Sequence, residues 1–223
     1  RSPGRGRRMT PFMSDPALHI LSMVTPTANN ALQAIGVAAA IKSRPGKPIV
    51  YCGVGDGSTQ QGEYLEAIGE AVREELPVLF VIQDNRWAIS TPTAGRTFFS
   101  LPDGPGESFF GLPIHYVDGR DVETAFHAFS ATVTQVRETR GPALVVFRVE
   151  RLSSHTNADD QTIYRTAEDL SKAEAESDPI QIAEAKLLKL GLTRSDLNVI
   201  QAQLKDQVAA AEAEAMVGED PLP

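Results

Sequence analysis

The sequence predicts an α/β fold, in which a parallel sheet is flanked by helices and is followed by a helical C-terminal tail. Apolar runs that are too short for helices recur along the chain, at residues 49–52, 78–82, 114–117 and 143–149. Strands that alternate with helices pair in parallel through right-handed crossovers. We therefore expect an α/β domain over residues 1–166 and a helical extension over residues 167–223.

Composition narrows the class of protein. The chain has 223 residues, of which 42% are hydrophobic, so it can build a core. Its net charge of −8 argues against nucleic acid as the main partner, because phosphate binding needs a cationic surface. No apolar run reaches about 18 residues, so no membrane span is predicted. The single cysteine, Cys52, lies inside an apolar run and is expected to be a buried, unreactive thiol.

The first elements are predicted in the following order. Residues 1–28 are expected to be irregular, and because the chain starts at an arginine without a signal-peptide pattern, we expect part of the domain to be missing before it. A helix follows over residues 31–42, with Asn29 or Asn30 as its N-cap. Its alanines and glycine favour close packing, although a subunit or cofactor contact is the alternative.

The remaining elements follow from the same signals. After the first strand, an amphipathic helix begins near Gln61, and Pro77 precedes the second strand. Residues 91–111 are predicted to be a loop. Asp121 is expected to cap a long helix, and residues 150–165 form a polar loop after the last strand.

Two turns carry the chemistry. Asp56 stands between Gly55 and Gly57 directly after the first strand, and the second strand ends at Asp84 and Asn85. The carboxyl ends of parallel strands are where open sheets bind ligands. Glycines let the backbone approach an anion, but a carboxylate there would repel a bare phosphate. Mg²⁺ resolves this conflict by bridging the carboxylate to a diphosphate, with Asn85 and the Trp87 carbonyl as further oxygen ligands.

Two other phosphate-binding motifs do not fit these turns. A dinucleotide fingerprint needs a third glycine, but Ser58 and Gln60 occupy the two positions where it would stand. A Walker loop needs Gly-Lys-Ser or Gly-Lys-Thr, which the sequence lacks.

The two turns also carry a family resemblance. GDG followed by Asn-Arg-aromatic, with Asn85 placed 29 positions after Asp56, resembles the thiamine diphosphate motif. With TPTANNALQAIGVAAA, QDNRWAISTPT and SSHTNADDQTIYR, the chain resembles the alpha subunit of the decarboxylating component of 2-oxo acid dehydrogenase complexes. WAISTPT and HTNADD are more similar to the branched-chain members than to the pyruvate members. The resemblance implies the thiamine diphosphate-binding fold.

The resemblance implies roles for individual residues. His155 would be the catalytic residue, in a mobile loop that reaches the thiazolium ring of thiamine diphosphate. A histidine in a polar loop can exchange a proton near neutral pH, although alone it reads as a surface residue. The implied Mg²⁺ ligands are Asp56, Asn85 and the carbonyl of Trp87. The implied cofactor contacts are Thr25, Thr27, Gly55, Gly57, Ser58, Asn85, Ile89 and His155.

Three departures from the family pattern matter. Gln83 stands where branched-chain members have an arginine that helps to bind diphosphate. Thr156 stands where some mitochondrial members have a phosphorylated serine. The glutamate that activates the aminopyrimidine has no candidate in this chain, and the family supplies it from a beta subunit. The chain alone is therefore expected to be inactive.

The resemblance implies oxidative decarboxylation of a branched-chain 2-oxo acid or pyruvate, with acyl transfer to a lipoyl group on an acyltransferase component. It implies a beta subunit, or a beta half of one polypeptide, as partner in an α2β2 assembly. The expected location is the cytoplasm in bacteria and the mitochondrial matrix in eukaryotes. Acetoin cleavage, transketolase-like transfer and a non-catalytic structural half are the alternatives.

Overall fold

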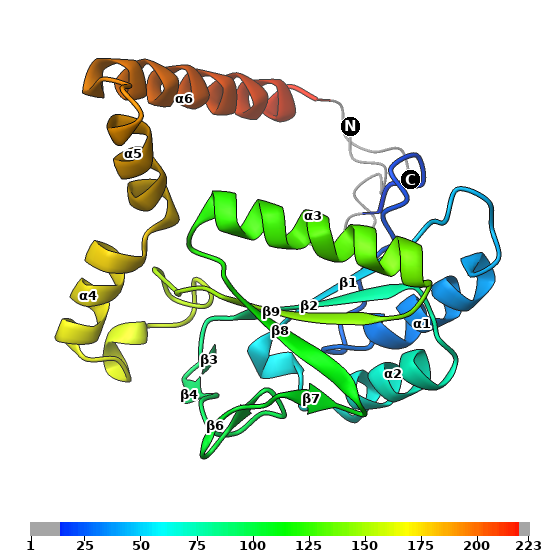
Figure 1. Ribbon diagram of the computed structural model, residues 1–223. Helices are drawn as coiled ribbons and strands as arrows, with labels where there is room; N and C mark the ends of the chain where they lie inside the picture. The colour runs from blue at the N-terminus through cyan, green and yellow to red at the C-terminus, as the bar shows by residue number, and fades with distance from the viewer. Residues whose placement is uncertain (1–13, 219–223) are drawn as a thin grey trace. The chain divides into compact units, whose positions relative to one another are not determined.

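A five-stranded sheet forms the centre of the computed structural model, which describes residues 14–218. Its strands are β1 (Val50–Gly55), β2 (Val78–Asp84), β9 (Ala143–Arg148), β8 (Leu112–Asp118) and β7 (Ser108–Phe109), in that spatial order (Figure 1). The first four pair in parallel, as expected from the alternation of strands and helices. Their carboxyl ends therefore meet at one edge of the sheet.

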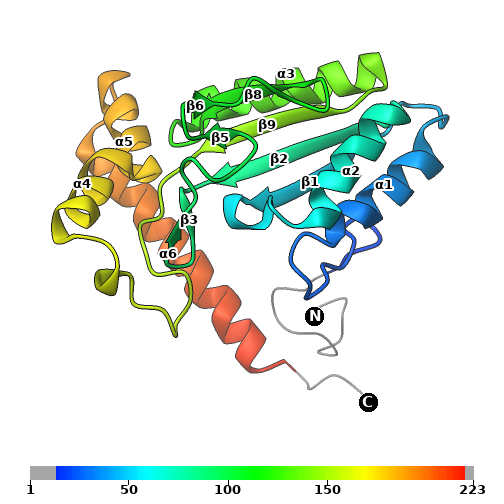
Figure 2. The same ribbon diagram turned by 90° about the horizontal axis from the view of Figure 1, so that it is seen from below.

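Three helices cover the two faces of the sheet. Helices α1 (Asn30–Ile41) and α2 (Gly62–Arg73) lie on one face, and α3 (Val122–Thr139) lies on the other (Figures 1 and 2). The first core includes Tyr64, Ile68 and Phe80, and the second packs Val136 against Leu79 and Val145. The α/β fold class predicted from the sequence is confirmed.

The ends of the helices test the predicted caps. Asp121 caps α3 as expected, because its side chain accepts hydrogen bonds from the backbone N–H groups of Glu123 and Thr124. The prediction for α1 is wrong, since Asn29 makes no side-chain cap hydrogen bond. Both asparagine amides bind neighbouring elements instead. Asn29 Nδ2 lies 3.2 Å from Glu63 Oε1, and Asn30 Nδ2 lies 3.4 Å from the Gly53 carbonyl.

The segment predicted as a loop over residues 91–111 contains short strands. They are β4 (Thr91–Pro92), which pairs with β3 (Trp87–Ala88), the hairpin of β5 (Ser100–Leu101) and β6 (Gly104–Pro105), and β7. β7 joins the main sheet antiparallel to β8. Aromatic packing holds the segment in place: Phe99 is buried, and the Phe98 ring stacks on Phe109 with centroids 4.3 Å apart.

The C-terminal part of the chain is helical, as expected. It contains α4 (Ala167–Ser177), α5 (Pro179–Lys189) and α6 (Arg194–Met216), preceded by the short η2 (Gln161–Ile163). The chain forms two compact units: residues 26–183 contain the sheet, and residues 14–25 with 184–218 form the other within the described part. The predicted boundary at residue 166 stays a prediction. Thr193 begins α6 with a capping box to Asp196.

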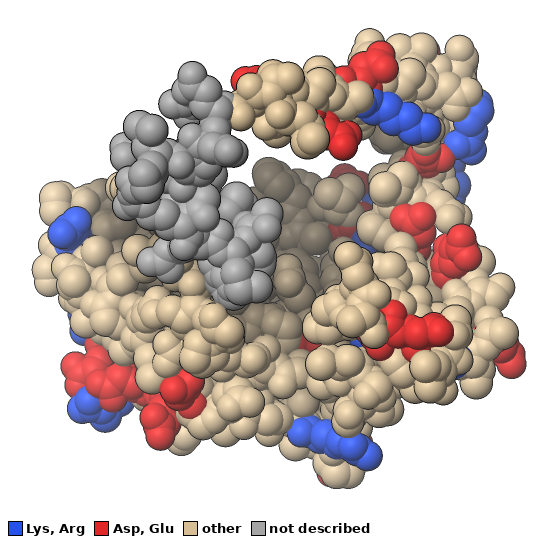
Figure 3. All heavy atoms as spheres, turned by 180° about the vertical axis from the view of Figure 1, so that it is seen from behind, with Lys and Arg blue, Asp and Glu red and all other residues tan. Residues whose placement is uncertain are grey.

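Two surface properties bear on function. No helix among residues 14–218 has both the length and the apolar character needed to cross a lipid bilayer. On the side seen in Figure 3, acidic and basic side chains are interspersed among uncharged ones, and the visible basic groups form no continuous patch.

The buried Cys52 thiol has its pKa raised by burial to about 12, which fits the expected unreactive role.

Candidate functional site

Two turns meet where β1 and β2 end. β1 continues directly into the short η1 (Asp56–Ser58), and β2 continues through Asn85 and Arg86 into β3. The turns pack so closely that a Cβ atom added to Gly57 would lie 2.7 Å from the Cβ of Ala88. Only glycine fits at this contact. The structure thus places the Gly-Asp-Gly turn against the turn that contains Asn85.

Asp56 is a buried carboxylate at this contact, with 1% of its surface exposed. Its Oδ2 accepts a hydrogen bond of 2.6 Å from the hydroxyl of Thr93. Burial raises the pKa of Asp56, the hydrogen bond from Thr93 lowers it, and the nearby Asp84 raises it again. Among the described residues, no ion pair with lysine or arginine offsets the negative charge of Asp56.

The second turn is held in an unusual backbone conformation. Arg86 and Ile89 have φ values of 67° and 56°, and left-handed backbone is rare for a β-branched residue such as isoleucine. Strain of this kind costs about 1–3 kcal/mol per residue and persists only where the surroundings enforce it. Asn85 Oδ1 accepts a hydrogen bond of 2.9 Å from the Trp87 N–H, which fixes the amide in the turn.

The residues of the two turns fit a hard dication. A buried carboxylate, an amide oxygen and a backbone carbonyl are the oxygen ligands that Mg²⁺ accepts, and a dication would offset the charge that burial disfavours at Asp56. Asn85 Oδ1 keeps a second lone pair beside its hydrogen bond to Trp87. Among residues 14–218, no group of three or more His, Cys, Asp or Glu is placed to hold a metal. The predicted Mg²⁺ ligands would not form such a group, because only Asp56 among them is a His, Cys, Asp or Glu side chain.

His155 lies in the polar loop between β9 and η2, where its side chain is exposed. The loop is anchored beneath it: Asp159 Oδ2 accepts 2.8 Å from the His155 N–H and 2.6 Å from the Tyr164 hydroxyl. These two hydrogen bonds lower the pKa of Asp159, that from Tyr164 most. The imidazole is therefore exposed, while the backbone of His155 is held by Asp159.

Two arginines form the frame of this loop. Arg165, whose side chain is 0% exposed, donates to the Arg151 carbonyl at 2.6 Å and pairs with Glu150 at 3.1 Å. Arg151 donates to the Tyr164 hydroxyl at 2.7 Å, and its guanidinium lies 5.7 Å from the centroid of the Trp87 ring. The loop is thus built around buried charge rather than around apolar packing.

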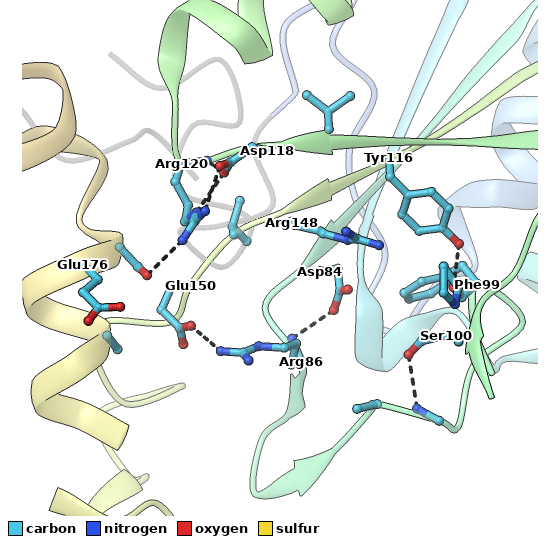
Figure 4. A pocket seen from close by; sticks show the side chains of 18 of the residues that line it. Asp84, Arg86, Phe99, Ser100, Tyr116, Asp118, Arg120, Arg148, Glu150 and Glu176 are labelled. Carbon is cyan, nitrogen blue, oxygen red and sulfur yellow. Dashed lines mark hydrogen bonds and ion pairs between the residues drawn. The ribbon is translucent and has the colours of Figure 1, made fainter. Parts of the chain in front are cut away.

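A hollow of about 990 Å³ lies beside these turns, at the carboxyl ends of β2, β8 and β9. Figure 4 shows Arg86 reaching Glu150, Arg120 paired with Asp118, and Arg148 between Asp84 and Tyr116. The guanidinium of Arg148 lies 4.7 Å from the Tyr116 ring centroid. Burial raises the pKa of Asp84. Asp56 and Asn85 are not part of the lining of this hollow.

The other residues predicted to contact the cofactor occupy exposed or partly exposed positions. Ser58 is half-buried in η1, and Ile89 is 52% exposed. Thr25 belongs to the smaller compact unit, whereas Thr27 belongs to the larger one. The exposed members of the set are Thr25, Thr27, Gly55, Gly57, Ile89 and His155.

Three residues of the site were not predicted from the sequence. Thr93 holds the carboxylate of Asp56, Glu150 pairs with Arg86, and Arg151 donates 2.6 Å to the Ile89 carbonyl. For Glu150 and Arg151, the only signal in the sequence was that two charged residues directly follow an apolar strand. For Thr93 there was none, because its partner is 37 positions away.

Comparison with known proteins places these turns in a family context. The family model for the dehydrogenase E1 component matches residues 2–221. The chain is 29% identical to mouse 2-oxoisovalerate dehydrogenase subunit alpha, mitochondrial, over 85% of this chain and 42% of that protein. It is 32% identical to 3-methyl-2-oxobutanoate dehydrogenase subunit alpha of Mycobacterium tuberculosis, over 76% of this chain and 46% of that protein.

A third relative carries a different substrate in its name. Over 61% of this chain and 39% of that protein, the chain is 36% identical to pyruvate dehydrogenase E1 component subunit alpha of Acholeplasma laidlawii. The chain thus spans less than half the length of these three relatives. Since the family model matches nearly every residue, the chain belongs to the dehydrogenase E1 component family.

Proposed function

We propose that this chain is the alpha part of a thiamine diphosphate-dependent 2-oxo acid dehydrogenase. The observation that carries the proposal is the contact between the Asp56–Ser58 turn and the Trp87–Ala88 strand at the carboxyl edge of the sheet. Open parallel sheets bind ligands at such an edge, and the chain belongs to the dehydrogenase E1 component family. The reaction is the oxidative decarboxylation of a 2-oxo acid.

The two turns hold the metal and the cofactor in this proposal. Asp56, Asn85 and the carbonyl of Trp87 would hold Mg²⁺, which would supply the positive charge that a diphosphate needs beside a buried carboxylate. Gly57 and Ser58 would contact the diphosphate through the short η1 turn. The remaining cofactor contacts are Thr25, Thr27, Gly55, Ile89 and His155. When bound, thiamine diphosphate supplies the electron sink that lets carbon dioxide leave.

His155 moves or holds a proton at the substrate. Its exposed imidazole stands on a loop whose backbone is anchored by Asp159. A histidine can donate a hydrogen bond to a substrate oxygen or return a proton near neutral pH. The beta partner supplies the glutamate that activates the cofactor, in an α2β2 assembly. The lipoyl group of an acyltransferase component would accept the acyl group, and the reduction of its disulfide to two thiols would take up the two electrons of the oxidation.

We propose a branched-chain 2-oxo acid as the first substrate to test. The mouse and mycobacterial relatives are named for 2-oxoisovalerate and 3-methyl-2-oxobutanoate, two names for one branched acid. Pyruvate is the second substrate to test, because the Acholeplasma relative is named a pyruvate dehydrogenase E1 component. Product formation from 2-oxoisovalerate, pyruvate and acetoin in the assembled protein separates these substrates and the acetoin alternative.

The proposal is tested by calorimetry on the alpha chain assembled with its beta partner. We expect thiamine diphosphate to bind only with Mg²⁺, and Asp56→Ala to abolish that binding. Asp118→Ala is the matched control, because Asp118 also ends a parallel strand but pairs with Arg120 at 2.8 Å. Binding without Mg²⁺, or retained binding in Asp56→Ala, would overturn the proposal.

A further inference from the structure

The turn that contains Asn85 is fastened to the loop of His155 at two points. The guanidinium of Arg86 forms an ion pair with the carboxylate of Glu150, as Figure 4 shows. Nη1 of Arg151 donates a hydrogen bond of 2.6 Å to the carbonyl of Ile89. Glu150 and Arg151 are consecutive residues at the root of the loop. Local sequence does not explain these contacts, because the partners are 64 and 62 positions apart.

The two residues of the turn that these contacts anchor both have left-handed backbone. Arg86 and Ile89, with φ values of 67° and 56°, bracket Trp87, whose carbonyl is one of the proposed metal ligands. A left-handed isoleucine is disfavoured on its own, so the contacts around it must hold it there. The centroid of the Trp87 ring lies 5.7 Å from the guanidinium of each of the two arginines of the loop frame.

The same contacts continue toward His155. Arg151 reaches the hydroxyl of Tyr164 with its other nitrogen at 2.7 Å, and that hydroxyl donates to Asp159, which accepts from the His155 N–H. Glu150 is held on its other side by the buried Arg165 at 3.1 Å. One connected set of hydrogen bonds therefore runs from the Ile89 carbonyl to the backbone of His155.

We propose that Arg86, Glu150 and Arg151 form a clamp that positions the metal-binding turn relative to His155. They are positioning residues, since no proposed contact with metal, cofactor or substrate involves their side chains. The clamp rests on the proposed function for the roles of the turn and of His155. Residues that orient metal ligands in this way change metal affinity by about 10–100-fold when they are removed.

Arg86→Met is the variant that tests the clamp. Arg86 is exposed, with a side chain 55% accessible, so its loss leaves the core intact. In the assembled protein with saturating thiamine diphosphate, we expect the affinity for Mg²⁺ to fall about tenfold or more. Arg120→Met is the matched control: Arg120 also follows a parallel strand and pairs with a carboxylate on the rim of the same hollow, but it does not touch the turn. Its Mg²⁺ affinity should stay at the wild-type value.

Two further measurements distinguish positioning from general destabilisation. The double variant Arg86→Met with Glu150→Gln should lose no more Mg²⁺ affinity than the more damaging single variant. Either single substitution already breaks the ion pair, so the second one has no ion pair left to remove. Arg86→Lys keeps one cationic donor for the single contact to Glu150, and it should recover most of the affinity. Full additivity, or no recovery with lysine, would count against the clamp.

Hydrogen exchange of the assembled protein without cofactor separates this inference from the proposed function. We expect Arg86→Met to speed exchange at residues 85–89, where the Trp87 N–H is bonded to Asn85, while Arg120→Met does not. If the wild-type assembly bound no Mg²⁺ and thiamine diphosphate, the proposed function would fail and exchange alone would decide the clamp. Unchanged exchange at these residues in Arg86→Met would overturn the clamp.

Discussion

Thr93→Val is the most informative single change at the site. It keeps the size of the side chain and removes the hydroxyl that donates 2.6 Å to Oδ2 of Asp56. Both residues are buried, so water cannot replace the lost donor freely. A hydrogen bond to a charged group contributes about 1.5–3 kcal/mol, and ionised Asp56 would lose that amount in the variant. The pKa of Asp56, already raised by burial, should rise further.

The sign of the pH dependence follows from this shift. A carboxyl whose folded-state pKa is raised disfavours folding once pH exceeds its unfolded pKa, and the penalty is complete above the folded-state pKa. Thr93→Val should therefore leave stability nearly unchanged below about pH 4, near the unfolded pKa of aspartate, and reduce it at neutral pH. Because Mg²⁺ binds the ionised carboxylate, its affinity should begin to fall at a higher pH in the variant than in the wild type.

The assay is a Mg²⁺ titration of the assembled protein with thiamine diphosphate, repeated from pH 5 to pH 8. Thr132→Val is the matched control, since the buried hydroxyl of Thr132 donates 2.8 Å to the Ala128 carbonyl within α3. Identical pH profiles for Thr93→Val and wild type would refute the reasoning. A shift of equal size in Thr132→Val would also refute it, because the effect would then be one of general stability.

Three further changes have defined outcomes. Gly57→Ala should abolish cofactor binding in calorimetry, because its Cβ would lie 2.7 Å from the next turn, whereas Gly62→Ala, with open space around it, should bind normally. The Cys52 thiol should resist alkylation in the folded assembly, since burial raises its pKa to about 12, and rapid labelling by mass spectrometry would contradict this. Asp159→Asn should increase proteolysis near His155. In the wild type the pKa of Asp159 is lowered, so the stability that its carboxylate gives the loop is present above the unfolded pKa and is lost as pH falls through the folded pKa. Acid should therefore cause the same cleavage in the wild type.

The sheet could be predicted because its signals are local. The central strands β2 and β9 are short apolar runs buried on both faces, and each helix on the sheet carries its own periodicity. Asp121 was found as a cap because its side chain satisfies backbone groups two and three positions ahead. Structural features that depend only on residues close together in the chain can be predicted directly from the sequence.

The caps of α1 and the short strands depend on distant partners. Asn29 and Asn30 look like N-caps, but their amides bind α2 and β1 because those elements pass close to the start of the helix. β7 has only two residues, too few for a pattern, and it is held in place because its own Phe109 stacks on Phe98, and both pack against the core. Tertiary contacts overrode local preference in both cases.

The same distinction applies to the site. Asp56 and Asn85 could be proposed from the sequence because both follow strands directly, and the parallel order of β1 and β2 then brings their turns together. Thr93, Glu150 and Arg151 could not, because each acts across a contact that exists only in the folded chain. The proposed metal ligands can thus be inferred from the local sequence, whereas the residues that hold their turns lie far away in the sequence.

This distribution has a consequence for how the site responds to change. A strained turn would relax if its only support were local, so the left-handed backbone at Arg86 and Ile89 requires the loop that holds it. That loop is stabilised by Arg165, a buried cation held by Glu150 and Asp169. Removing one partner of a buried ion pair costs about 3–5 kcal/mol, far more than an exposed pair contributes. Substitutions at Glu150, at the root of the His155 loop, should therefore disturb both that loop and the turn that contains Asn85.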